Sequence, residues 1–136
     1  MKSVEELDLP EDYRYADDHE WAKLDGDKVR VGLDDYAQDQ LGEIVYVELP
    51  QVGAVFQKGD VFGMVESVKA VSDCYMPVGG EVVAVNSALE DSPQLINQSP
   101  YDDGWMIDVK PADIAEMDTL YTREGILEKL KEGGEQ

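Results

Sequence analysis

Apolar residues recur in short runs along this chain, and most runs alternate with polar residues or end at glycine or proline. Residues 21–24 and 28–33 alternate on either side of Asp25-Gly26-Asp27. Alternation with period two is typical of a half-buried strand, and an Asp-Gly pair favours a tight turn. This segment therefore predicts a β-hairpin.

Further strands follow from the same pattern. Short runs rich in β-branched residues predict strands at residues 44–49, 54–56, 81–86 and 105–110, and Pro50 ends the first of them. Many short strands separated by Gly and Pro turns are typical of a small β-barrel or sandwich. The pattern therefore predicts a mainly β fold.

A few short helices are expected around these strands. The first begins at a cap, Asp34 or Asp35, runs through Leu41 and stops at Gly42, because carboxylates favour N-caps and glycine favours the C-terminal end. A helical turn is expected to end at Ile96, with Ser92 as its cap and a proline in first position.

Two more helices are expected near the C-terminus. They span residues 111–120 and 124–131, and the second places Ile126, Leu127 and Leu130 on one side. We expect residues 1–12 to be a loose acidic leader that packs through Val4, Leu7 and Leu9. Residues 13–132 should form one domain, and 133–136 a flexible tail.

Residues 61–76 have the β-branched and aromatic content typical of strands, and one amine, Lys69, stands near the middle of this stretch. As a single strand this stretch would be far longer than usual, so it should fold back on itself near Val68-Lys69. Valine and lysine are poor hairpin-turn residues, since Gly, Asn or Asp is preferred there. A local rule broken at one position is where function is expected. The alternative is that Lys69 is an ordinary solvated lysine on a strand edge.

Composition narrows the possible partners. With 31 acidic and 11 basic residues among 136, the formal charge is −20, which disfavours binding to nucleic acid and to anionic membrane surfaces.

The single cysteine, Cys74, excludes an internal disulfide, and it is expected to be a small buried apolar residue. No run approaches the length of a transmembrane helix. The acidic start, unlike a signal or transit peptide, favours a bacterial cytoplasmic location or, as the alternative, an already processed organellar form. We expect a monomer.

Motifs for catalysis are scarce. His19 is the only histidine, and no CxxC, P-loop, GxGxxG or GxSxG string occurs. Zinc sites need three or four suitable ligands, so a transition-metal site is not expected. A hydrolytic site using His19 stays open on counting alone, without a nucleophile motif to support it.

The residues around Lys69 resemble a known modification site. The string Glu66-Ser67-Val68-Lys69-Ala70, followed by Ser72-Asp73, is similar to the modified hairpin of lipoyl and biotinyl carrier domains. Biotin carriers usually flank the lysine with methionines, and lipoyl domains of 2-oxoacid dehydrogenases usually place Asp before it. Here Val68 precedes the lysine and Ala70 follows it. The string most resembles a third group, the H proteins of the glycine cleavage system.

This resemblance extends from about Tyr13 to Ile126. The similar strings, in family order, are His19-Glu20-Trp21, Asp35-Tyr36-Ala37-Gln38 with Leu41-Gly42, Val47-Glu48-Leu49-Pro50, Glu66 to Asp73, Gly80-Glu81-Val82 with Val85-Asn86, and Pro100-Tyr101 with Gly104-Trp105. The acidic leader and the tail depart from the family.

The resemblance implies a barrel-sandwich hybrid fold and a non-catalytic carrier. Lipoic acid would be attached to Lys69 by a lipoate ligase or octanoyltransferase. Its dithiolane would take the aminomethyl group of glycine from the P protein, a pyridoxal-phosphate glycine decarboxylase, and deliver it to the tetrahydrofolate-dependent T protein. The L protein, a flavoprotein, would reoxidise the dithiol.

The resemblance also implies contacts for the loaded arm. Acidic residues matching Glu20 and Asp73 would lie near its amine, and Glu66 and Ser67 are further candidate arm contacts; the alternative for the carboxylates is an ordinary solvated surface. Two other functions stay open. One is an H-like relay that donates lipoyl groups to other enzymes, and the other is an unmodified interaction domain or a small hydrolase using His19.

Overall fold

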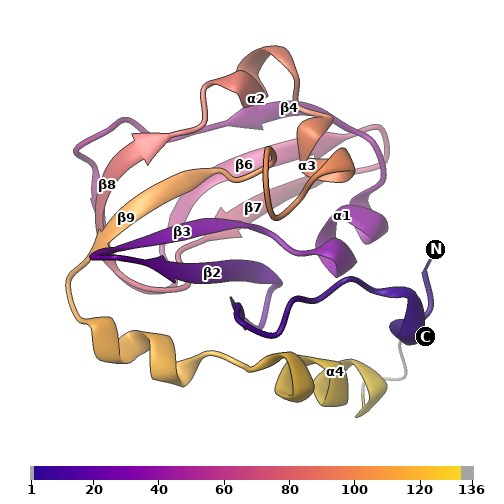
Figure 1. The fold of residues 1–136 in the computed structure, drawn as a ribbon. Helices are drawn as coiled ribbons and strands as arrows, with labels where there is room; N and C mark the ends of the chain where they lie inside the picture. Colours follow the sequence, from indigo (N-terminus) through magenta and orange to yellow (C-terminus); the bar gives the residue numbers. More distant parts are fainter. Residues whose placement is uncertain (1, 133–136) are drawn as a thin grey trace.

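The computed structural model describes residues 2–132, which form two antiparallel β-sheets with short helices around them (Figure 1). The larger sheet has six strands in the order β1-β2-β3-β9-β8-β5, and the smaller has three in the order β4-β6-β7. This confirms the predicted mainly β fold. No helix within residues 2–132 is long and apolar enough to cross a bilayer.

The strands of the larger sheet come from both ends and the middle of the chain. They are β1 (Arg14–Tyr15), β2 (Glu20–Asp25), β3 (Lys28–Leu33), β5 (Val55–Phe56), β8 (Gly80–Val85) and β9 (Ile107–Pro111). The smaller sheet contains β4 (Ile44–Glu48), β6 (Val61–Ser67) and β7 (Val71–Tyr75). The hairpin predicted around Gly26 is confirmed as β2–β3, and the long apolar stretch folds back as β6–β7.

The helices are short. They are η1 (Val4–Glu6), α1 (Asp35–Leu41), α2 (Ala88–Asp91), α3 (Leu95–Gln98), η2 (Ile114–Thr119) and α4 (Arg123–Glu132). Helix α1 confirms the predicted caps, because the Asp34 side chain accepts a hydrogen bond from the Ala37 amide and Gly42 ends the helix with φ 76°.

Two helix predictions were wrong in detail. Ser92 does not cap the turn that contains Ile96: its amide donates to the Ala88 carbonyl, so Ser92 ends α2, a turn that the sequence had not predicted. The next turn, α3, begins only at Leu95 and has no side-chain cap. The helix expected over residues 111–120 is a shorter 3₁₀ helix, because the chain stays in β9 through Pro111 and Asp113 caps the turn that follows.

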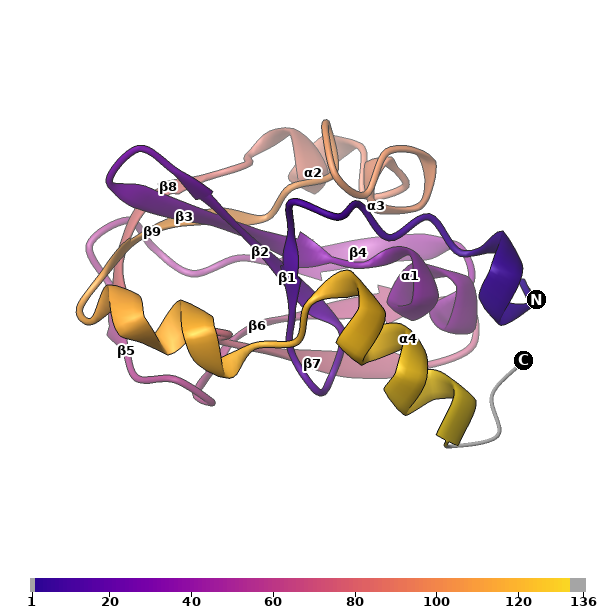
Figure 2. The ribbon, with the colours of Figure 1, turned by 60° about the horizontal axis from the view of Figure 1, so that its bottom comes forward.

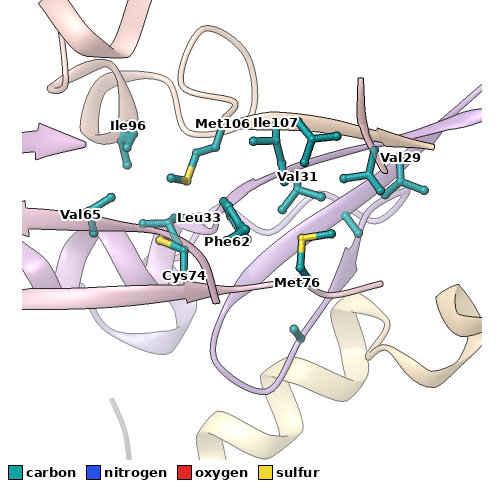
Figure 3. Close-up of a cluster of buried hydrophobic side chains, with 14 of the residues drawn as sticks. Val29, Val31, Leu33, Phe62, Val65, Cys74, Met76, Ile96, Met106 and Ile107 are labelled. Atoms are coloured by element: carbon teal, nitrogen blue, oxygen red, sulfur yellow. The ribbon is translucent and has the colours of Figure 1, made fainter. Parts of the chain in front are cut away.

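The core fills the space between the sheets. Figure 3 shows Leu33, Phe62, Cys74 and Met106 within it, and Cys74 is buried as expected. Side chains that point into the core, such as Ala22 and Val31, alternate with side chains on the other face of the sheet along β2 and β3, because successive residues of a strand point to opposite faces.

A second apolar cluster covers the outer face of β1 and β2. Helix α4 lies against β1 and η1 (Figure 2). The buried members of this cluster are Val4, Leu7, Leu9, Tyr15, Trp21, Ile126 and Leu130. The expected packing of the leader through Val4, Leu7 and Leu9 is therefore confirmed, while the predicted tail at 133–136 lies outside the described residues.

Candidate functional site

The β6–β7 hairpin places Lys69 at an exposed tip. The strands pair through Glu66 and Val71, and the backbone then turns within residues 67–70. The Ser67 amide donates to the Ala70 carbonyl at 2.8 Å. The Ser67 Oγ accepts hydrogen bonds from the amides of Lys69 at 3.1 Å and Ala70 at 3.0 Å. A serine side chain thus satisfies the turn amides that Asn or Gly would otherwise organise.

A contact from outside the hairpin also holds the tip. The Val68 amide donates to the Glu43 carbonyl at 3.2 Å, which joins the tip to the segment between α1 and β4. The aliphatic end of Lys69 lies over Gly42, where a Cβ would come within 3.3 Å of the lysine Cε. The tip is therefore supported by its own serine and by the end of α1.

The Lys69 amine suits covalent attachment. Its side chain is exposed, and within residues 2–132 no hydrogen bond or ion pair engages Nζ. An amide bond at this nitrogen would cost no existing contact. Attachment would also remove a charge, so that an apolar arm could lie on the protein surface without stranding a cation. The residues present therefore fit an acyl-linked prosthetic group on Lys69.

The surface around the tip is apolar and acidic. Val45, Tyr46, Val68 and Val71 are all exposed there. Tyr46, Glu66 and Val71 form one row across the three strands, and Glu48, Met64 and Asp73 form the row two residues further along. The candidates Glu66 and Asp73 thus share one face of the sheet, two rows apart, and Asp73 borders a cavity of about 490 Å³ at the far end of these strands.

Glu20 lies elsewhere, buried where β2 meets the end of β7. Only 1% of it is exposed, and its Oε2 accepts a hydrogen bond from the Tyr75 amide at 3.1 Å. Burial, and then the hydrogen bond and negative charge of Asp18, raise the pKa of Glu20 to about 10. Oε1 has no hydrogen-bond partner among the described residues. Glu20 is therefore neutral at pH 7.

Asp18 is the functional candidate that the sequence analysis missed. It is exposed beside Glu20, and it lines a cavity of about 270 Å³ together with Tyr75 and Tyr121. Burial, and then the effect of nearby carboxyl groups, raise the pKa of the Cys74 thiol. Cys74 lies near the end of β7 that is far from Ser67 and Lys69. No sequence signal singled out Asp18 among 31 acidic residues.

His19 contacts a carboxylate and an aromatic ring, and neither is a nucleophile of the kind that a hydrolytic site needs. Its Nδ1 lies 2.9 Å from Oδ2 of the buried Asp34, and its ring lies 4.4 Å from that of Tyr36. His19 has a positive φ of 72°, which is uncommon without glycine. Within residues 2–132, no group of three or more His, Cys, Asp or Glu side chains is arranged to hold a metal ion.

Two packed antiparallel sheets, with a lysine presented at the tip of a hairpin of the smaller sheet, define a carrier domain of the lipoyl and biotinyl class with a barrel-sandwich fold. A family model described as glycine cleavage H-protein matches residues 13–133. The chain belongs to the glycine cleavage H-protein family, the lipoyl carriers of the glycine cleavage system.

Individual relatives agree with this assignment. A glycine cleavage system H protein of Geobacillus sp. (strain WCH70) is 50% identical over 127 residues, covering 93% of this chain and all of the relative. One from Thermus thermophilus is 53% identical over 125 residues, covering 92% of this chain and 98% of the relative. The crystal structure of an H protein from Mycobacterium marinum matches with a TM-score of 0.81 at 39% identity, covering 93% of this chain and 99% of that one.

Proposed function

We propose that this protein is the lipoyl-lysine carrier of a glycine cleavage system and that Lys69 is its attachment site. The observation that carries the proposal is the exposed, unpartnered Lys69 amine at a doubly supported hairpin tip, in a chain of this family. When bound, lipoic acid supplies a disulfide that accepts the one-carbon amine unit of glycine. The chain itself needs no catalytic group for this task.

The residues of the chain serve this function by mounting the arm. Ser67 and the Glu43 carbonyl fix the tip, so the attached group starts from a defined point and sweeps a limited volume. A tether of this kind replaces diffusion between enzymes with a high local concentration. We propose as partners the P, T and L proteins and a lipoate ligase or octanoyltransferase.

Carboxyl groups near the arm would stabilise the cationic amine that the loaded arm carries. A cation held away from bulk water needs a negative partner, or burial would drive off its proton. Asp73 and Glu20 are the proposed contacts, and Asp18, whose negative charge acts on Glu20, joins them from the structure. Because Glu20 carries a proton at neutral pH, it can donate or accept a hydrogen bond, while Asp18 supplies charge.

Intact mass spectrometry after coexpression with a lipoate ligase tests the attachment site. The parent chain should gain the mass of one lipoyl group. Lys69→Arg should fold normally and gain none, because a guanidinium stays protonated and is a poor acyl acceptor. A lipoyl mass on Lys69→Arg would place the attachment on another lysine. An unmodified parent chain would favour a plain interaction domain.

A further inference from the structure

Asn97 of α3 is far from Lys69 in the sequence, but its side chain is hydrogen-bonded to the segment that contacts the Lys69 tip. Its Nδ2 donates to the Gly42 carbonyl at 2.8 Å and to Gln38 Oε1 at 3.1 Å, and its Oδ1 accepts from the Ile44 amide at 2.9 Å. One amide side chain therefore holds the residues on both sides of Glu43.

Glu43 is the residue whose carbonyl supports the tip. Its oxygen accepts the Val68 amide hydrogen, and the preceding residue, Gly42, is the one against which the Lys69 side chain lies. Glu43 is itself exposed, so its own side chain is not packed into the core. The position of its carbonyl is set by its two neighbours, and Asn97 bonds to the backbone of both.

We infer that Asn97 is a positioning residue for lipoate attachment, which acts on Lys69 through Gly42 and Glu43. The inference rests on the proposed function. Without these hydrogen bonds the tip would keep its Ser67 turn but would lose its fixed place relative to the domain. An enzyme that acylates Lys69 would then find the correct geometry in only a fraction of molecules, and its apparent affinity falls by that fraction.

A matched pair of variants separates positioning from general stability. Asn97→Asp keeps the shape and the acceptor for the Ile44 amide, but it turns the donor to Gly42 into a carboxylate oxygen. Asn86→Asp makes the same change at a second asparagine, whose Nδ2 donates to the Asp103 and Trp105 carbonyls at 2.7 and 2.8 Å. Asn86 is 8% exposed and has no part in the tip.

Steady-state kinetics of lipoate attachment by a purified ligase, with the carrier as the varied substrate, give the main measurement. Asn97→Asp should raise KM about tenfold, the effect of losing one or two hydrogen bonds, while kcat stays within about twofold. Asn86→Asp should leave both constants near those of the parent, even if it lowers the unfolding temperature as much as Asn97→Asp does. Acetylation of Lys69 by a small reagent should be equal in all three chains, since a small reagent does not depend on the mount.

Hydrogen exchange of the unmodified protein gives a second measurement that needs no enzyme. The Val68 amide should exchange faster in Asn97→Asp than in the parent or in Asn86→Asp, because its acceptor is no longer held. Parent-like KM and parent-like Val68 exchange in Asn97→Asp would overturn the inference, and so would an equal rise of KM in Asn86→Asp. A parent chain that takes no lipoate would instead overturn the proposed function.

Discussion

The two long hairpins of this protein are closed in different ways. The β2–β3 hairpin turns at Gly26, which takes φ 65° between the paired residues Asp25 and Lys28. Among residues 2–132, nothing beyond its chain neighbours would come within 4 Å of a Cβ placed at Gly26. The β6–β7 hairpin has no glycine at its tip. It is closed by the Ser67 side chain and held by the Glu43 carbonyl.

This difference shows what a functional tip requires. A glycine turn fixes its own geometry and depends on nothing else. In the serine turn, Val68 and Lys69 occupy the positions where a glycine turn would need glycine. The position of this tip is fixed further by the hydrogen bond to Glu43, in another part of the domain. The Lys69 tip is therefore the hairpin whose geometry can be disturbed from a distance.

Lengthening each tip should give the largest contrast. Two glycines inserted after Val68 should leave the sheets folded but displace Lys69 from Gly42 and Glu43, and lipoate attachment should slow about 100-fold, the scale expected for misplacing a reacting group. The same insertion after Gly26 should leave attachment unchanged. Ligase kinetics on both chains provide the measurement, and normal attachment to the first would show that a fixed tip is unnecessary.

The two hairpins are joined by the hydrogen bond from the Tyr75 amide of β7 to the Glu20 carboxyl of β2. The second largest effect is expected here, on the pH dependence of stability. Between the ordinary pKa of a glutamate and the raised value of about 10, the folded chain holds a proton that the unfolded chain has lost. Stability should therefore fall as pH rises through this window, by at most about 1.4 kcal/mol per pH unit from this group. Glu20→Gln keeps the acceptor for the Tyr75 amide and removes the titration.

Denaturant unfolding at several pH values tests this expectation. Glu20→Gln should exceed the parent in stability at pH 8, and the advantage should shrink toward pH 5. A constant difference across this range would mean that Glu20 is ionised in the folded protein.

Removing the serine hydroxyl should have a smaller effect. Ser67→Ala removes the acceptor for two exposed backbone amides, which water can partly replace, so the loss of stability should be about 1 kcal/mol. Attachment to Lys69 should slow several-fold, and the Lys69 amide should exchange faster with solvent. Unchanged exchange at Lys69 would show that the Glu43 contact alone holds the tip.

The smallest effect on function is expected at the other hairpin. Gly26→Ala forces an L-residue into a positive φ, which costs about 1–2 kcal/mol, and thermal unfolding should register this loss. Lipoate attachment should match that of the parent. Slower attachment would show that the two hairpins are coupled through Glu20.

Sequence reasoning succeeded where the determining signal is local. Asp-Gly predicts the β2–β3 turn, and Asp34 with Gly42 marks both ends of α1. The excessive length of residues 61–76 as a single strand placed the β6–β7 bend correctly. The sequence could not predict the hydrogen bonds of the segment beside that bend, because Asn97 is 55 residues from Gly42 and follows no periodic pattern. The Ser-Pro pair at Ser92 was ambiguous, since serine can end one helical turn or begin the next.

The burial of Cys74 has a consequence for redox chemistry. An arm that alternates between disulfide and dithiol is open to attack by any nearby thiolate, which would trap it as a mixed disulfide. The only thiol of this chain is fully buried, and burial, with nearby carboxyl groups, raises its pKa, so it stays protonated and unreactive. With the lipoyl arm proposed for Lys69, the domain would therefore present no competing sulfur nucleophile of its own to the arm's disulfide.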